Sequence, residues 1–197
     1  MKKFLLLICI LFTSFLCTAC INNLAIQELN QMGKDYLDKG DFDNAVSRFQ
    51  SSVDLDENVF ESRYNLGVAY ISKEDYKNAI PHLKQAVLIN PSNPDAYYSL
   101  AVALESEGLA FEKNPLDDSN TDTEEEIKTE VSAKEVLESL SLVEESVKMY
   151  EKYLELSPEA KDKERVQAHI QFLNDSCIRI KEEYKIDAVN TDDLKDE

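Results

Sequence analysis

The fold of this chain is decided by residues Tyr64–Ile80, YNLGVAYISKEDYKNAI. The apolar residues of this stretch recur every three or four positions and predict two short amphipathic helices. Gly67 lies inside the first of them, where glycine costs about 0.5–1 kcal/mol of helix stability relative to alanine. The position of Gly67 therefore needs an explanation from the rest of the sequence.

The explanation is an internal repeat. Gly33 and Gly67 are 34 residues apart, and Gly40 and Gly108 are 68 apart, which is twice that period. Apolar and aromatic positions follow the same period: Met32, Leu66 and Leu100; Tyr36, Tyr70 and Leu104; Phe42 and Tyr76; Ala45 and Ala79; Phe49 and Leu83; Leu55 and Ile89. Periods of this length are typical of helical repeat proteins.

A 34-residue helix-turn-helix unit with these small and large residues resembles the tetratricopeptide repeat. The resemblance implies an all-α fold, a short α-solenoid of about three such repeats. It also implies that Gly67 and Gly33 lie where the two helices of a repeat cross closely, because a residue without a β-carbon lets the partner helix approach. Gly40 and Gly108 are expected in turns between helices, where glycine adopts positive φ.

The repeat, together with the composition of the sequence before and after it, divides the chain into segments. In order these are a lipoprotein-type signal peptide (1–19), a short anchor segment (20–25), repeat 1 (26–59), repeat 2 (60–93), repeat 3 (94–158), a capping helix (159–185) and an acidic disordered tail (186–197). An acidic insert at about residues 109–142 interrupts repeat 3, because the period would place Lys113, Asp117 and Asn120 where its second helix needs alanine or an aromatic residue. That helix returns later, as one long helix over about Val131–Leu156.

Apolar residues after Pro158 predict a last amphipathic helix. They recur every three or four positions: Val166, Ile170, Leu173, Cys177, Ile180 and Tyr184. A helix with a polar outer face closes the exposed end of a solenoid. Cys177 lies on the apolar stripe and is expected to be a small core residue.

The first 20 residues have the organisation of a secretory signal peptide. The basic start MKK is followed by the 13 largely apolar residues Phe4–Leu16 and then by CTAC. This region resembles bacterial lipoprotein signal peptides, in which a small residue precedes a cysteine that becomes lipidated. Cleavage after Ala19 would leave Cys20 as the lipidated N-terminus. Two alternatives remain open: an uncleaved anchor, because Phe4–Ile21 is nearly long enough to span a bilayer, and plain secretion.

The charge of the chain excludes two classes of partner. The sequence has 21 Lys+Arg against 39 Asp+Glu, a formal net charge of -18. A nucleic-acid-binding surface needs a basic footprint, and docking on anionic lipid headgroups needs one as well. We therefore expect no nucleic-acid partner, and contact with a membrane only through the N-terminal lipid.

No catalytic, cofactor or metal site is predicted. The sequence contains no G-x-S-x-G, P-loop or H-E-x-x-H motif. Its two histidines, His82 and His169, lie on different helices, and His82 is expected on the solvated outer face of its helix.

The acidic insert supports an alternative function. Asp118, Asn120 and Asp122 have the spacing of the first ligands of a calcium loop, but Thr123 and Thr129 stand where such a loop needs glycine and glutamate. The alternative is an acidic cation-binding or transport-accessory envelope protein that acts through residues 114–126.

The tetratricopeptide resemblance implies a binding groove lined by the first helices of the repeats. The candidate groove residues are Asn30, Lys34, Tyr64, Asn65, Val68, Tyr98 and Val102. Asn65 matches the clamp that some family members use for a C-terminal carboxylate. Four positions hold other residues than the mostly basic ones that the clamp needs, so we do not expect a carboxylate clamp: Asn30, Lys34, Asp95 and Ser99. A groove with an apolar and aromatic middle suits an extended or helical peptide. We therefore expect a non-catalytic adaptor that binds another protein of the bacterial cell envelope and is lipid-anchored on the extracytoplasmic side, at the outer membrane or the periplasmic face.

Overall fold

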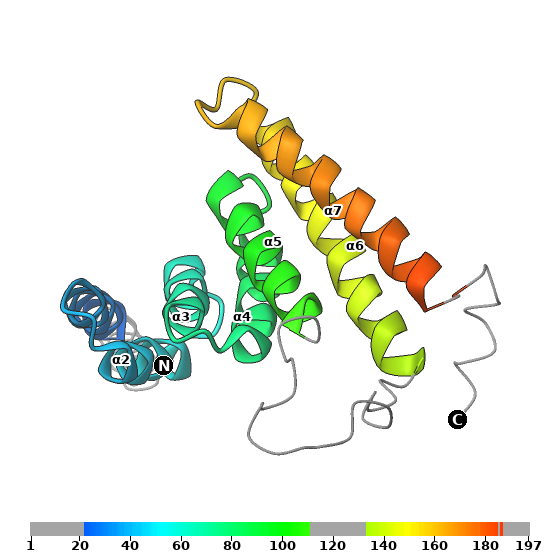
Figure 1. The fold of residues 1–197 in the computed structure, drawn as a ribbon. Helices are drawn as coiled ribbons and strands as arrows, with labels where there is room; N and C mark the ends of the chain where they lie inside the picture. Colours follow the sequence, from blue (N-terminus) through cyan, green and yellow to red (C-terminus); the bar gives the residue numbers. More distant parts are fainter. Residues whose placement is uncertain (1–21, 111–132, 185, 187–197) are drawn as a thin grey trace, which may run out of the picture. The chain divides into compact units, whose positions relative to one another are not determined.

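A computed structural model of the chain describes residues 22–110, 133–184 and 186 (Figure 1). The elements in these ranges are helices. Residues 22–38 form the N-terminal helix, and it is followed by α2 (Phe42–Leu55), α3 (Phe60–Ser72), α4 (Tyr76–Ile89), α5 (Pro94–Gly108), α6 (Ala133–Leu156) and α7 (Lys163–Glu183). The expected all-α fold class is confirmed. None of these described helices combines the length and the apolar composition that crossing a membrane requires.

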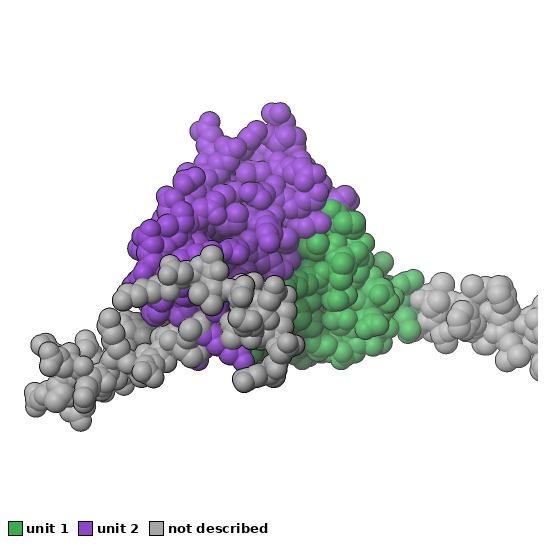
Figure 2. Space-filling model, turned by 90° about the vertical axis from the view of Figure 1, so that its right-hand side faces the viewer, with its two compact units in different colours: residues 1–91 green, residues 92–197 purple. Residues whose placement is uncertain are grey.

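The chain divides into two compact units, residues 1–91 and residues 92–197 (Figure 2). Unit 1 contains the N-terminal helix and α2–α4, and unit 2 contains α5–α7. Each unit has a hydrophobic core of its own.

In unit 1, the same capping chemistry begins both second helices. Asp41 precedes α2 and Asp75 precedes α4, and each carboxylate accepts a hydrogen bond of 3.3 Å from a backbone N–H three residues later, that of Asn44 or Asn78. Such a cap satisfies one of the N–H groups that a helix start leaves without a partner. The caps are one period apart, so the repeat also sets where these helices begin.

The mid-helix glycines lie where paired helices of unit 1 cross. A β-carbon added to Gly33 would lie 2.5 Å from Phe49 Cε1, and one added to Gly67 would lie 2.5 Å from Leu83 Cγ. Phe49 and Leu83 are fully buried. The helix cost of glycine is therefore offset by close packing of the partner helix, and the role predicted for both glycines is confirmed.

The two predicted turn glycines differ. Gly40 has a φ of 72°, which glycine adopts without strain, so its prediction is confirmed. Glu74, one period later, has a φ of 59°, and because it carries a β-carbon this conformation is strained. The turn predicted for Gly108 is wrong, because Gly108 is the last residue of α5 and a β-carbon there would lie 2.9 Å from the backbone oxygen of Ser139. Gly108 permits close packing of α5 on α6.

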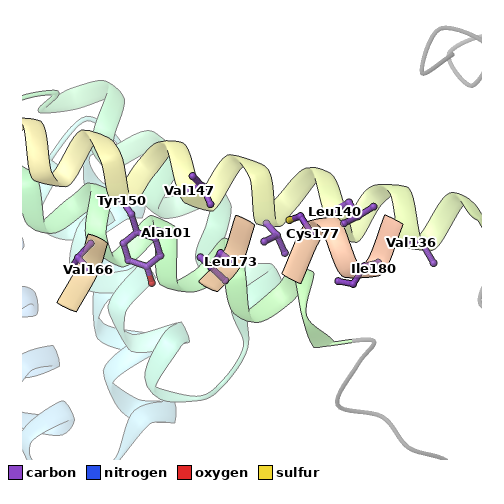
Figure 3. Packing of buried hydrophobic residues seen from close by; sticks show 10 residues of the cluster. Ala101, Val136, Leu140, Val147, Tyr150, Val166, Leu173, Cys177 and Ile180 are labelled. Carbon is purple, nitrogen blue, oxygen red and sulfur yellow. The ribbon is translucent and has the colours of Figure 1, made fainter. Parts of the chain in front are cut away.

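Unit 2 is built around the long helix α6. Its core contains Ala101 from α5, Val136, Leu140, Val143, Val147 and Tyr150 from α6, and Val166, Leu173, Cys177 and Ile180 from α7 (Figure 3). Val166 lies towards the Tyr150 end of α6 and Ile180 towards its Val136 end, so the two long helices are antiparallel (Figure 3). The second half of α7 thereby covers the first half of α6, the part of α6 that the repeat itself does not require.

These contacts confirm two predictions for unit 2. The long helix expected over about Val131–Leu156 is present as α6, and Cys177 is a buried core residue. The outer face of α7 is mostly polar, although Phe172 and Ile178 remain 55% and 56% exposed. Ile186, which the sequence assigns to the tail, packs against this core.

Candidate functional site

Asn30 is the first of the predicted groove residues, and the structure places it inside unit 1. Its side chain is 3% exposed, and its Nδ2 donates a hydrogen bond of 3.0 Å to Ser62 Oγ. Asn30 therefore joins the N-terminal helix to α3, and its assignment to a ligand-facing surface is corrected.

The hydrogen bond of Asn30 is the first link of a buried relay. Ser62 Oγ and Ser52 Oγ are 2.7 Å apart, and Ser52 Oγ donates to the backbone oxygen of Ile26 at 3.5 Å. Because a hydroxyl has one hydrogen, Ser62 must donate to Ser52. The relay ties the N-terminal helix, α2 and α3 together and satisfies polar groups that are costly to bury without partners.

Asn65 lies one helical turn beyond Ser62, on the same face of α3. Its side chain is 9% exposed, and no described atom of the protein accepts a hydrogen bond from its Nδ2. A buried donor without a partner costs about 1–3 kcal/mol. Buried polar groups in folded proteins nearly always have partners, and among the described residues Asn65 Nδ2 shares this exception with Asn30 Oδ1 and Arg48 Nε.

Three further predicted residues surround Asn65. Lys34, on the N-terminal helix, forms an ion pair with Glu61 of α3, and both side chains are exposed. The ring of Tyr64 stacks on that of Phe60, with centroids 5.7 Å apart and planes within 9°. Val68 is half-buried. Glu61, Tyr64, Asn65 and Val68 are three or four positions apart on α3 and so lie on the same side of that helix. Lys34 joins them through Glu61, and we call the predicted residues on this side the Asn65 surface: Lys34, Tyr64, Asn65 and Val68.

The predicted residues of unit 2 are half-buried and anchored. Tyr98 makes edge-to-face contacts with Tyr150, at 5.6 Å between centroids, and with Tyr153, at 5.2 Å. Val102 packs against the core of unit 2. Tyr64 and Tyr98 belong to different units, and the single groove predicted to contain both stays a prediction.

A pocket that the sequence did not predict lies in unit 2. Its volume is about 460 Å³. It is lined by Tyr98 of α5, Tyr150 of α6, and Arg165, Val166, Ala168, His169 and Phe172 of α7. We call it the α7 pocket. The spacing of Arg165, His169 and Phe172, at intervals of four and three residues, is the signal in the sequence that could have identified this face of α7.

A carboxylate fixes the rings of the α7 pocket. Glu105 Oε2 accepts a hydrogen bond of 2.9 Å from the hydroxyl of Tyr150 and lies 2.8 Å from His169 Nε2. Because an ionised carboxylate only accepts hydrogen bonds, Nε2 carries the proton that points at Glu105. Burial, with the charge of Glu105 and the hydrogen bond to it, raises the pKa of Tyr150 well above its usual value. The phenol therefore remains a donor throughout the physiological range.

A second carboxylate holds the neighbouring tyrosine. The hydroxyl of Tyr153 donates to Asp162 Oδ1 at 2.8 Å, and this hydrogen bond raises the pKa of Tyr153 to about 12. Asp162 also accepts from Arg165 Nη2 at 3.1 Å. Two carboxylates, Glu105 and Asp162, thus join α5, α6 and the start of α7 beside the pocket.

His82, in unit 1, is not on a solvated face, so that prediction is wrong. Its Nδ1 accepts a hydrogen bond of 3.2 Å from Arg63 Nη1, and its ring stacks on Tyr70 with centroids 5.7 Å apart. Burial, and then the charge of Arg63, lower the pKa of His82. The period identified the helix of His82, but not the arginine of the preceding helix that covers it.

Several predictions concern residues outside the described ranges. These are the signal peptide (1–19), Cys20, and the insert residues Asp118, Asn120 and Asp122. Within the described ranges, no group of three or more His, Cys, Asp or Glu side chains is arranged to hold a metal ion.

A comparison with known protein families finds a match in this chain. Residues 69–108 match the family model described as TPR repeat, the tetratricopeptide repeat. A comparison with curated proteins finds no relative of this sequence.

Solved structures of TPR domains are similar to this chain. The first TPR of Spaghetti (RPAP3) bound to HSP90 peptide SRMEEVD has a TM-score of 0.55 and 20% identity, over 78% of this chain and 93% of that chain. The second TPR domain of human RPAP3 in complex with HSP70 peptide SGPTIEEVD has a TM-score of 0.54 and 15% identity, over 76% and 98%. MamA, residues 41 to the end, from Desulfovibrio magneticus RS-1 has a TM-score of 0.55 and 22% identity, over 81% and 72%. These similarities show a TPR-type helical repeat fold, whereas the repeat boundaries drawn from the sequence stay predictions.

Proposed function

We propose that the protein is a non-catalytic interaction module that binds a peptide or helix of a partner protein at the Asn65 surface. Support comes from the fold, because similar TPR domains are bound to the peptides SRMEEVD and SGPTIEEVD. Those peptides are ligands of the other proteins. Here they support only the class of ligand, a segment of polypeptide.

The observation that carries this proposal is the unused donor of Asn65. The residue as a whole keeps 9% exposure, and its Nδ2 is buried without a partner among the described atoms. Rotation about the Cβ–Cγ bond of asparagine is broad and soft, and a small rotation brings Nδ2 outward. A backbone carbonyl of a bound peptide can then accept from it, which converts the cost of the unsatisfied donor into binding energy.

The surroundings of Asn65 suit the side chains of a peptide. The ring of Tyr64 stacks on that of Phe60 beside Asn65, and Tyr is enriched among the residues that dominate binding at interfaces. The exposed pair of Lys34 and Glu61 offers a charge of each sign at the edge. The surface thus combines a side-chain donor for a peptide backbone, an aromatic contact and a polar rim.

The decisive variant is Asn65→Leu. Leucine has the same number of side-chain heavy atoms and the same branching as asparagine, and it removes a buried donor that no described atom satisfies, so the melting temperature should stay unchanged or rise. Binding should weaken about tenfold or more, because the hydrogen bond to the ligand is lost. A partner is first captured from detergent-solubilised membranes and purified, and its affinity is then measured by titration calorimetry.

Two further variants complete this test. Asn174→Leu makes the same change at an exposed position of α7 and should alter neither property. Tyr64→Ala should weaken binding about 30-fold, the equivalent of about 2 kcal/mol. A normal affinity for Asn65→Leu contradicts the proposal, and so does a fall of several degrees in its melting temperature, which would make Asn65 a structural residue.

We also propose that the module is anchored by a lipid on Cys20 at the extracytoplasmic side of a bacterial envelope, where its partner is another envelope protein. The support is the sequence of the first 20 residues, with Ala19 before Cys20. More than one acyl chain gives stable anchoring where one chain is marginal. The partner is a protein and not a nucleic acid, in keeping with the net charge of -18.

Mass spectrometry of the membrane-extracted protein tests the anchor. The N-terminal peptide should begin at residue 20 and carry the added mass of lipid, and Cys20→Ser should lose that mass. Cys9→Ser is the matched control, because Cys9 lies in the apolar segment that cleavage removes and ten residues before Ala19. A peptide that retains residues 1–19 would support the uncleaved anchor instead, and an unmodified soluble protein would support secretion.

A further inference from the structure

We propose that the α7 pocket of unit 2 binds an aromatic group that carries a carboxylate. This inference goes beyond the proposed function, which rests on unit 1. The ligand can be a free aromatic acid or the aromatic C-terminal residue of a polypeptide, since both present the same ring and the same charge.

The walls of the α7 pocket call for an aromatic ligand. The ring of His169 contacts Tyr150 edge-to-face at 5.5 Å between centroids and stacks on Phe172 at 6.1 Å. Phe172 is 55% exposed. Tyr98 adds a further ring, edge-on to Tyr150. Rings arranged in this way offer both faces and edges, and a bound ring gains from either geometry.

The size of the α7 pocket suits a single ring. Its volume of about 460 Å³ falls at the lower end of the range of small-molecule sites, about 300–1,000 Å³. The contacts of Tyr150 and His169 with Glu105 hold two of its rings in place before any ligand arrives. A site that is already formed loses little conformational freedom on binding.

The lining of the α7 pocket includes one group that can bind an anion, the guanidinium of Arg165. Apart from His169, Arg165 is the only ionisable side chain other than tyrosine among the lining residues, and no carboxylate lines the pocket. The guanidinium of Arg165 is 73% exposed, and its Nη2 pairs with Asp162. A guanidinium has five N–H donors in a planar fork, so the same group can also receive a carboxylate. Glu105 is held behind the rings by Tyr150 and His169, so it does not face the cavity as a lining residue, and Arg165 is the lining group that can bind an anion.

The test uses 3-phenylpropionate as the probe and the full chain as the receptor. Binding is followed by nuclear magnetic resonance through the ring signals of His169 and Tyr150, and a dissociation constant of about 1 mM is expected for a ligand of this size. The neutral amide, 3-phenylpropionamide, should bind at least about tenfold more weakly, because it lacks the charge. 3-Cyclohexylpropionate should also bind more weakly, because it lacks the ring.

Two variants and two matched controls locate the probe. Arg165→Gln and Phe172→Ala should each weaken binding of 3-phenylpropionate about tenfold, and both residues are exposed enough for the fold to survive. Arg179→Gln and Ile178→Ala make corresponding changes at exposed positions of the same helix and should leave binding unchanged. Unchanged melting temperatures verify that all four variants are folded.

The outcomes separate the sources of the ligand and the two proposals. A peptide that ends in phenylalanine with a free carboxylate should lose affinity when its end is amidated. If it binds more tightly than 3-phenylpropionate, the ligand is a polypeptide end, and if it binds more weakly, the ligand is a free acid. The inference is overturned if 3-phenylpropionate and 3-phenylpropionamide bind equally well. It is also overturned if a variant and its control lose the same affinity for 3-phenylpropionate. Neither result affects the Asn65 surface, which is tested by different variants.

Discussion

The α-carbon of Gly67 lies so close to Leu83 that a β-carbon on it would be 2.5 Å from Leu83 Cγ. The same relationship joins Gly33 to Phe49 one period earlier. The first and second helices of each pair in unit 1 thus approach at a glycine and fill the space with one large buried side chain.

Gly67→Ala should lower the stability of unit 1. Forcing a methyl group into packed space costs about 1–3 kcal/mol, and the better helix propensity of alanine returns about 1 kcal/mol. The melting temperature should therefore fall by a few degrees, and Gly67→Leu should prevent unit 1 from folding. In a Leu83→Ala background the cost of Gly67→Ala should disappear, because the clashing side chain is gone. A cost that is unchanged in that background would show that the close approach is not its cause.

Glu74→Gly should stabilise unit 1. A residue with a β-carbon in the left-handed conformation costs about 1–2 kcal/mol, and Glu74 has a φ of 59°. Glycine removes this strain, but it also raises the conformational entropy of the unfolded chain, which offsets part of the stabilisation. We therefore expect the free energy of unfolding, measured with heat or urea, to rise by about 0.5 kcal/mol. Gly40→Ala, at the equivalent turn with a φ of 72°, is the reciprocal control and should destabilise. A loss of stability in Glu74→Gly would contradict the strain.

The stability of unit 1 should fall as the pH drops below about 6.5. Burial and the charge of Arg63 lower the pKa of His82 in the folded protein, so the unfolded chain binds more protons there. Stability therefore rises with pH in this window and is complete above the ordinary pKa of histidine. His82→Phe keeps a ring beside Tyr70 and should flatten this part of the profile of urea midpoint against pH. His169→Gln is the control in unit 2, and an identical slope in wild type and His82→Phe would refute the assignment.

Tyr150→Phe should destabilise unit 2 by about 1.5–3 kcal/mol. The change removes a hydroxyl that donates to the carboxylate of Glu105 at 2.9 Å, and hydrogen bonds to charged groups are worth more than neutral ones. Tyr153→Phe removes a similar bond to the more exposed Asp162 and should cost less. Unfolding in urea measures both. An equal loss of unfolding free energy in the two variants would show that burial of Glu105 does not strengthen its hydrogen bond with Tyr150.

The sequence predicted features that depend on the period of one helix or of the repeat. The glycines at 33 and 67 could be assigned to helix crossings because they recur among large apolar partners. α6 and α7 could be predicted because each has an apolar stripe along its own length. Such features are set by neighbouring residues on one helix, which a sequence displays directly.

Features that depend on contacts between different helices could not be predicted. The α7 pocket needs α5, α6 and α7 together, and the insert before α6 removes the period that would have related them. Gly108 continues the series of the turn glycine Gly40, but packing against Ser139 of α6 decides its role. The burial of Asn30 and the hydrogen bond between Arg63 and His82 depend in the same way on side chains of a neighbouring helix.

The packing of α5 on α6 has a consequence for the order of folding. In unit 1, consecutive helices are joined by turns of a few residues, so their contacts are local. In unit 2, α5 ends at Gly108 and α6 begins at Ala133, so this contact closes a loop of more than twenty residues. Loop length changes the equilibrium only slowly, by about 0.6 kcal/mol for each doubling, but rates fall as contacts become less local. Unit 1 should therefore form on a nascent or refolding chain before α5 finds its partner, and the first half of the protein would be structured while the second is still searching.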